Sequence, residues 1–160
     1  MLTCKAAGKP KPILTWTIVG SSKVLSNTST LTIINVRRPG RRDNAIRYQC
    51  TAFNGVQSPA TATAIIIVYY PPTTTILLTV PGNNTVLKGS IVSLKCDTDA
   101  SPLAHVYHFY FNDNHIGRSD SGVFHVTAEK DGNYTCVPLN TVGMGDNATV
   151  IVTVVGKFNK

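Results

Sequence analysis

The feature that most constrains this chain of 160 residues is a short pattern around cysteine that occurs twice. In each copy a tyrosine stands two residues before the cysteine and an asparagine stands four residues after it. The members are Tyr48, Cys50 and Asn54 in the first copy, and Tyr134, Cys136 and Asn140 in the second. Because side chains alternate along a β-strand, the tyrosine and the cysteine face the same side of a sheet. Each copy therefore predicts a strand that carries an aromatic ring and a sulfur into one core.

A second cysteine lies upstream of each copy, Cys4 for the first and Cys96 for the second, in short alternating runs at residues 2–4 and 92–96. A complete repeat of this kind favours two domains of about 70 and 90 residues over a single domain. We expect the first domain at residues 1–70, the second at residues 71–155, and a linker or tail at residues 156–160.

The first repeat contains further features in a fixed order. Trp16 follows Cys4 by twelve residues, and an alternating apolar segment at residues 31–36 comes before Tyr48 and Cys50. This order resembles the immunoglobulin superfamily, in which strand B carries a cysteine, strand C a core tryptophan and strand F a tyrosine two residues before the second cysteine. The second repeat resembles the same family with one departure, because Phe109 stands where the tryptophan is expected. Fc-receptor-like and platelet-adhesion-type domains show that variation.

The resemblance implies an all-β fold, with two tandem immunoglobulin-like β-sandwiches of the I-set or C2 type, as in hemicentin-like proteins. Its core signature falls on Trp16, Tyr48, Phe109 and Tyr134. The first domain begins directly at strand B and lacks an N-terminal A strand, whereas residues 76–80 and 85–88 read as strands A and A′ of the second. We therefore expect a fragment, and a first domain that is less stable than the second because sheet edges are left unpaired.

Four cysteines allow three disulfide connectivities by counting alone. Two repeats, each with its own core, favour the pairs Cys4–Cys50 and Cys96–Cys136. Each pair would close a loop, and the chain-entropy model predicts that each such link stabilises the folded state by roughly 4 kcal/mol. Structural disulfides imply an oxidising compartment and hence an extracellular location. A zinc site is the alternative use of the cysteines, but no C-x-x-C spacing supports it.

The remaining elements follow from alternation and turn residues. In the first domain we expect strands at 13–18, 23–25, 29–36 and 60–68, and in the second at 105–111, 122–126, 132–137 and 147–155. Residues 97–103 read as the loop between strands B and C of the second domain. The junction at residues 69–72 contains two prolines and no glycine or serine, so we expect it to be short and stiff.

Charge is distributed unevenly along the chain. Residues 1–70 contain nine basic and one acidic side chain, a net charge of +8, whereas residues 71–160 have a net charge of −1. Four arginines, Arg37, Arg38, Arg41 and Arg42, fall in one expected loop, and Lys9 and Lys11 lie in another. Guanidinium groups bind sulfate and carboxylate oxygens bidentately. The pattern predicts a patch for an anionic glycan such as heparan sulfate or for an acidic protein surface; the alternative is a solvated basic loop. Nucleic acid is a poor partner because interleaved aromatic residues are missing.

Four N-glycosylation sequons begin at Asn27, Asn83, Asn133 and Asn147. Asn133 lies on the strand face opposite Tyr134 and Cys136, so that sequon should point outward. Catalysis and cofactors find no support, because the four histidines lack ligand spacing and no nucleophile motif is present. Asp97 and Asp99 are two residues apart beside an expected loop, and two acids are too few for a typical calcium site.

These observations predict an extracellular recognition module of a cell-adhesion molecule or cell-surface receptor. Its binding to protein partners would be homophilic or heterophilic. An anionic-glycan-binding matrix protein and passive spacer domains in a receptor-kinase ectodomain are the alternatives. We expect no enzyme activity. Any membrane anchor would lie in parts of the parent protein beyond these residues.

Overall fold

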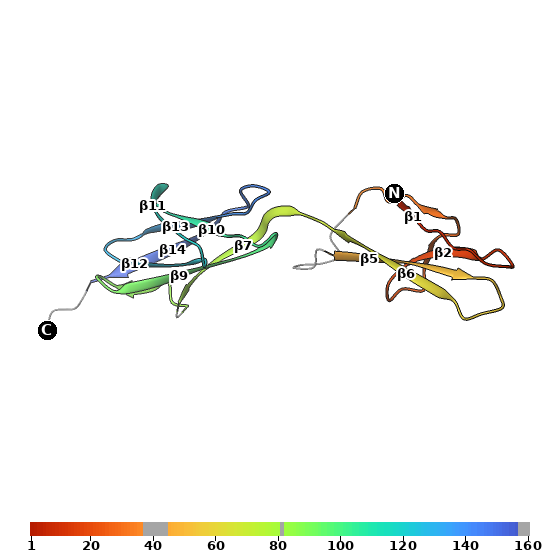
Figure 1. The fold of residues 1–160 in the computed structure, drawn as a ribbon. Helices are drawn as coiled ribbons and strands as arrows, with labels where there is room; N and C mark the ends of the chain where they lie inside the picture. The colour runs from red at the N-terminus through yellow and green to blue at the C-terminus, as the bar shows by residue number, and fades with distance from the viewer. Residues whose placement is uncertain (37–44, 81, 157–160) are drawn as a thin grey trace. The chain divides into compact units, whose positions relative to one another are not determined.

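A computed structural model describes residues 1–36, 45–80 and 82–156. The described residues form strands and turns without a helix, and they divide into two compact units, Met1–Val68 and Tyr69–Lys160 (Figure 1). Each unit has two layers of mainly antiparallel strands that bury apolar side chains and a disulfide between them. The predicted all-β architecture of two tandem sandwiches is confirmed.

The first unit pairs a very short sheet with a larger one. The short sheet is β1-β4 and the larger one has the order β3-β2-β5-β6. The strand bounds are β1 Leu2–Thr3, β2 Ile13–Ile18, β3 Val24–Ser26, β4 Thr30–Leu31, β5 Ala45–Phe53 and β6 Ala60–Ile67. All of these pairings are antiparallel.

The core of the first unit surrounds the disulfide between Cys4 and Cys50, whose S–S distance is 2.06 Å. Trp16 is directly opposite Cys50 in the ladder of β2 and β5, and its ring packs with Tyr48 and Leu31 around the sulfurs. Within the described residues, the Trp16 Nε1 is a buried donor without a hydrogen-bond partner. An unpaired buried donor typically costs about 1–3 kcal/mol, so the tryptophan is held by apolar packing alone.

The fourth strand of the first unit is much shorter than the alternation predicts. We expected a strand over residues 29–36, but β4 covers only Thr30–Leu31. Its one ladder partner in the described part of the chain is the two-residue β1, so pairing ends there. Asn35 then adopts a left-handed backbone conformation with φ of 56°, which interrupts an extended strand.

The second unit contains a three-stranded and a five-stranded sheet. Their orders are β12-β9-β7 and β11-β10-β13-β14-β8. The bounds are β7 Tyr70–Val80, β8 Thr85–Leu87, β9 Ile91–Ser101, β10 Val106–Phe111, β11 Asn114–Ser119, β12 Val123–Thr127, β13 Gly132–Leu139 and β14 Ala148–Val155. The pairing of β8 with β14 is parallel and all others are antiparallel.

The core of the second unit repeats the arrangement of the first. Phe109 is opposite Cys136 in register, the position that Trp16 has relative to Cys50. It is completely buried, packs in one cluster with the Cys96–Cys136 disulfide, and stacks on Phe124 at a centroid distance of 5.0 Å. A phenylalanine therefore occupies the place of the tryptophan, and the second ring supplies the missing volume.

The asparagine of the repeated motif has the same local role in both units. The Oδ1 of Asn54 accepts hydrogen bonds from the backbone N–H groups of Val56 and Gln57. The Oδ1 of Asn140 accepts from those of Val142 and Gly143. Such side-chain to backbone bonds fix the turn that follows the strand.

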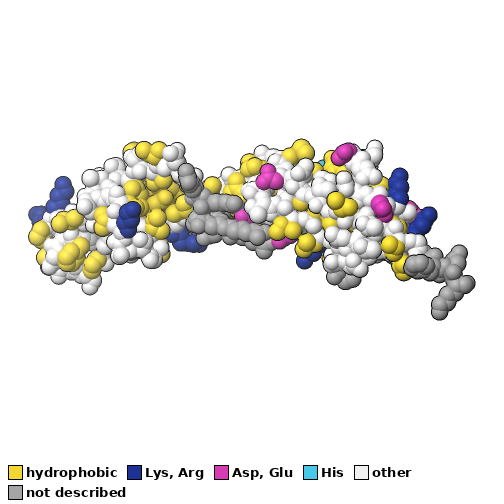
Figure 2. Space-filling model, turned by 180° about the vertical axis from the view of Figure 1, so that it is seen from behind, with side chains coloured by type: hydrophobic (Ala, Val, Ile, Leu, Met, Phe, Trp, Pro, Cys, Tyr) yellow, Lys and Arg dark blue, Asp and Glu magenta, His cyan; other side chains and the backbone are white. Residues whose placement is uncertain are grey.

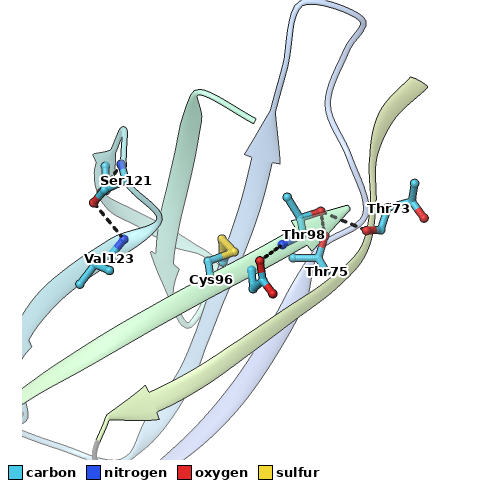
Figure 3. The surroundings of a disulfide bond; sticks show 9 residues. Thr73, Thr75, Cys96, Thr98, Ser121 and Val123 are labelled. Carbon is cyan, nitrogen blue, oxygen red and sulfur yellow. Dashed lines mark hydrogen bonds between the residues drawn. A yellow bond between two sulfur atoms is a disulfide. The ribbon is translucent and has the colours of Figure 1, made fainter. Parts of the chain in front are cut away.

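The prediction of a loop at residues 97–103 is wrong, because β9 continues to Ser101. It stays paired with β7, which starts at Tyr70 instead of residue 76. Polar side chains stabilise this extension. Figure 3 shows Thr98 beside the disulfide, where its hydroxyl bonds to Thr73 O at 3.1 Å and lies 3.2 Å from the Thr75 hydroxyl.

Asp99 belongs to the same extension and is fully buried. Its Oδ1 accepts a hydrogen bond of 3.0 Å from the Tyr70 hydroxyl. The carboxylate is therefore part of the packing between β9 and β7, which removes it from the surface where a calcium site would form.

The two prolines that we read as a stiff junction are built into β7 of the second unit. Pro72 is among the most deeply buried side chains, and its carbonyl accepts a hydrogen bond from Asp146 N. The side chain of Asn140 donates to Tyr70 O and to Pro102 O, both at 2.8 Å. Residues 70–72 are thus held by the turns at the end of this unit's own sandwich.

A hairpin that the alternation did not reveal adds β11 to the larger sheet. Asn112 and Asp113 both have positive φ, 44° and 66°, between the paired residues Phe111 and Asn114. Two consecutive residues with positive φ are typical of a type I′ turn, for which asparagine and aspartate are favoured. The Asn-Asp pair was the available signal.

We predict that Gly145→Ala destabilises the second unit by about 1–3 kcal/mol, the usual cost of overpacking. A Cβ at this position would lie 2.3 Å from the carbonyl oxygen of Pro72, so backbone would have to move. Urea unfolding of the intact chain measures the effect. The control is Gly156→Ala, because a Cβ at Gly156 meets no atom within 4 Å. Equal stability of the two variants would show that Pro72 is not held against the Gly145 turn.

We also predict a loss of stability at alkaline pH that depends on Tyr134. Burial raises the pKa of this phenol above its ordinary value of 10.0. The folded state thus favours the neutral ring, and this contribution is complete below pH 10 and is lost as the pH rises through the higher folded pKa. The slope is at most about 1.4 kcal/mol per pH unit. Tyr134→Phe should lose less stability than the parent between pH 9 and pH 11 in urea unfolding. Parallel curves for the parent and Tyr134→Phe would contradict this.

Candidate functional site

The outer face of the sheet β3-β2-β5-β6 is the most distinctive surface of the first unit. Cys50 and Tyr48 point into the core, so the alternate residues of β5 point outward. The register places those of β2 and β6 beside them. The outward set is Ile13, Thr15 and Thr17 from β2, Ala45, Arg47, Gln49, Thr51 and Phe53 from β5, and Thr61, Thr63, Ile65 and Ile67 from β6.

This outer face combines exposed apolar residues with threonines and is almost without charge. Ile13 is 68% exposed, and its ladder partner Phe53 is 47% exposed. Ile65 is 57% exposed opposite Arg47, the one charged residue in the outward set. Exposed apolar side chains that lie together on one face mark interaction surfaces more often than isolated ones do. Hydroxyl groups of the intervening threonines offer hydrogen bonds without the desolvation cost of a charge.

The sequence of strand β6 contains a signal that could have predicted the outer face. Its three alanines and Ile66 lie on the side of Cys50, whereas Thr61, Thr63, Ile65 and Ile67 point outward. An amphipathic strand normally places its larger apolar residues inward. Two of the three isoleucines of β6, Ile65 and Ile67, point outward when the strand is read against the position of Cys50, and both are exposed.

The equivalent sheet of the second unit lies among the glycosylation sequons. Asn133 points outward from β13, and Asn147 immediately precedes β14 in the same sheet. Both are exposed, as are Asn83 in the second unit and Asn27, which follows β3 at the sheet edge in the first. All four acceptor asparagines are thus accessible in the fold, and none lies within the strands β2, β5 and β6 of the outer face.

The predicted anionic-ligand patch falls mainly outside the described residues. This applies to Arg37, Arg38, Arg41 and Arg42, so no position is given for them. Lys9 and Lys11 are both exposed in the segment between β1 and β2. In the view of Figure 2, acidic side chains lie on the second unit, and the described surface of the first unit shows lysine and arginine among hydrophobic side chains.

One apolar groove of about 330 Å³ opens in the second unit. Rings and aliphatic chains line it, with Lys130 near its rim and the Lys130 Nζ 5.7 Å from the centroid of Phe111. Its apolar and aromatic walls are formed by Phe111, Ile116, Phe124, Val126 and Tyr134. The polar and charged side chains on its walls are His125, Thr127, Glu129 and Lys130, and Lys130 makes the cation–π contact with the ring of Phe111.

Within residues 1–36, 45–80 and 82–156, no group of three or more His, Cys, Asp or Glu side chains is arranged to hold a metal ion. The same residues contain no helix that is long and apolar enough to cross a membrane.

Comparison with known protein families matches both units to models described as immunoglobulin domains. One match covers residues 1–54 and the other residues 75–154. The chain belongs to the immunoglobulin superfamily. The two disulfides need an oxidising compartment, so this immunoglobulin-superfamily chain is extracellular.

Among curated proteins, the chain is similar to human protein turtle homolog B, with 31% identity over 171 residues. The alignment covers 96% of this chain and 12% of that protein. The chain is also similar to rat limbic system-associated membrane protein, with 32% identity over 166 residues, covering 94% of this chain and 46% of that protein. The chain thus spans less than half the length of either relative.

Among solved structures, the ectodomain of mouse nectin-like molecule 4 superimposes with a TM-score of 0.69 at 18% identity, covering 95% of this chain and 57% of that one. One chain of the complex between Dpr2 Ig1-Ig2 and DIP-Theta Ig1-Ig3 gives a TM-score of 0.63 at 23% identity, covering 96% of this chain and 58% of that one. At these identities the likeness concerns the fold, and it agrees with the tandem sandwiches described above.

Proposed function

We propose that this chain is an extracellular recognition module of a cell-adhesion molecule or cell-surface receptor, which acts by binding proteins and has no catalytic role. The observation that carries the proposal is the outer face of β2, β5 and β6, an exposed apolar and threonine-rich surface with one charge. Similarity to limbic system-associated membrane protein supports a cell-surface setting.

The composition of this face suits association between folded proteins. Ile13 with Phe53 at one end of β5, and Ile65 opposite Arg47 toward the other end, supply apolar area that a partner would bury at about 25 cal/mol per Å². Threonine and glutamine supply hydrogen bonds that fix register, and Arg47 supplies a residue type enriched at binding hot spots. A second copy of the same face is the first partner to test, because a nearly uncharged surface meets no repulsion from itself.

Glycans would direct binding to this face. We propose that Asn27, Asn83, Asn133 and Asn147 are glycosylated, which would shield the larger sheet of the second unit at Asn133 and Asn147. The corresponding sheet of the first unit has no acceptor within β2, β5 or β6. Mass loss on glycosidase treatment of secreted protein tests the glycosylation.

We predict that a glycan placed on the outer face abolishes binding. Thr61→Asn creates the sequon Asn-Ala-Thr at residues 61–63 on outward-facing β6. Beads coated with the secreted parent should clump, and beads coated with this variant should not. The matched control is Lys88→Asn, which creates Asn-Gly-Ser at an exposed turn of the second unit and adds one glycan elsewhere.

Clumping that persists with glycosylated Thr61→Asn would remove the outer face from the proposal. Failure of parent beads to clump would rule out homophilic binding, and capture of the parent by cell surfaces, again compared with the two variants, would then test heterophilic binding.

A second candidate function is binding of an anionic glycan such as heparan sulfate. The observation that favours it is the net charge of +8 on residues 1–70, with Arg37, Arg38, Arg41 and Arg42 within six positions. Sulfate groups attract clustered guanidinium groups, and the attraction weakens with salt.

We predict that replacing these four arginines with alanine lowers the salt concentration at which the chain elutes from immobilised heparin. The control replaces Lys88, Lys95, Arg118 and Lys130 with alanine, which removes the same number of charges from the second unit. Equal shifts for both variants would mean that net charge alone governs retention. The chain would then act as protein recognition domains or spacers without a glycan site.

A further inference from the structure

Two histidines lie together on the outer face of the larger sheet in the second unit. His108 is on β10 and His115 is on β11, the two strands joined by the Asn112-Asp113 turn. The Nδ1 of His108 is 3.3 Å from the Nε2 of His115. The rings have centroids 5.4 Å apart and are inclined by 53°. The sequence did not reveal this pair, because β11 and its register were not predicted.

The distance between the two nitrogens matches one particular coordination geometry. Two nitrogen ligands bound to Zn²⁺ at ~2.0–2.1 Å and at the tetrahedral angle are ~3.3–3.4 Å apart. Ligands at a right angle, as in square-planar or octahedral sites, would be only ~2.8–2.9 Å apart. The observed 3.3 Å agrees with two corners of a tetrahedral site. Both Nδ1 and Nε2 of neutral imidazole bind metals.

The surroundings hold the pair in place and decide which ions suit it. The ring of Tyr110, the ladder partner of His115, meets the exposed imidazole edge-on at a centroid distance of 5.3 Å. On β10, β11 and β13 the charged neighbour is Arg118, the ladder partner of His108, and these strands carry no carboxylate. Without anionic oxygen ligands, the hard cations Ca²⁺ and Mg²⁺ are disfavoured.

We propose that His108 and His115 form a two-histidine binding site for Zn²⁺ on the β10-β11 hairpin. The ion replaces the hydrogen bond that the two rings share. The donor ring takes its other neutral tautomer, losing the proton of the shared nitrogen and gaining one from solvent at its far nitrogen, so each neutral ring presents a lone pair. Two coordination positions remain open to water or to a donor from another molecule. This site is independent of the first unit's outer face.

The test is calorimetric titration of ZnCl₂ into the metal-free, tag-free chain of 160 residues, with the histidine ring resonances followed by NMR. We expect one Zn²⁺ per chain and joint shifts of the His108 and His115 rings. His108→Gln and His115→Gln should each weaken binding about tenfold or more, because either change removes chelation. The control is the double variant His105→Gln, His125→Gln, which keeps the pair and changes the chain's other two histidines.

Unaltered binding in both single variants, a shift of only one of the two rings, or no heat of binding would each overturn the site. Thermal unfolding of each variant without metal checks that the second unit stays folded. If a glutamine variant does not fold, the NMR shifts in the parent decide alone, since they report ligation by each ring directly. Addition of MgCl₂ in place of ZnCl₂ should leave both rings unchanged.

Discussion

Both units depend on one constraint, a disulfide that joins the two layers of the sandwich against an aromatic ring. The cysteine of strand β5 or β13 is in register with the ring on the adjacent strand, Trp16 in one unit and Phe109 in the other. Sandwiches of this size bury only about 60% of the surface of their unfolded chains, so a covalent link between the layers is a large part of their stability. Because side chains alternate along a strand, the inward direction of the cysteine also determines which of its neighbours point outward. A shift by one residue would turn every outward side chain of β5 into the core.

Much of this followed from the sequence because alternation around cysteine is a local signal. The positions of β2, β5 and β13 and the inward rings could be derived from it, and the asparagine four residues beyond each cysteine indicated the turn that it caps. The failures lie where polar residues form strands. Asp97, Thr98 and Asp99 have the composition of a loop, yet Tyr70 and the threonines of β7 provide partners that keep β9 paired. Those partners are more than twenty residues away in the chain, so no local pattern reports them.

The candidate surfaces show the same division between local and distant information. The four arginines of residues 37–42 stand out in the sequence because they are adjacent in it. The outer face of β2, β5 and β6 does not, since its members come from three strands and are gathered only by register. Likewise, His108 and His115 are seven residues apart, and no repeat of strand period links them. The two-residue turn at Asn112 and Asp113 brings their ring nitrogens together.

The start of β7 bears on how such domains can be exchanged between proteins. The family pattern of the second domain begins at residue 75, which lies in the middle of this strand. A chimera joined at that point would carry the disulfide and the core rings, but would leave behind the phenol that donates to Asp99 and the proline packed beneath Gly145. The physical module is therefore longer than its recognisable pattern. Recombination that keeps the second unit intact has to fall before Tyr70, within the few residues after β6.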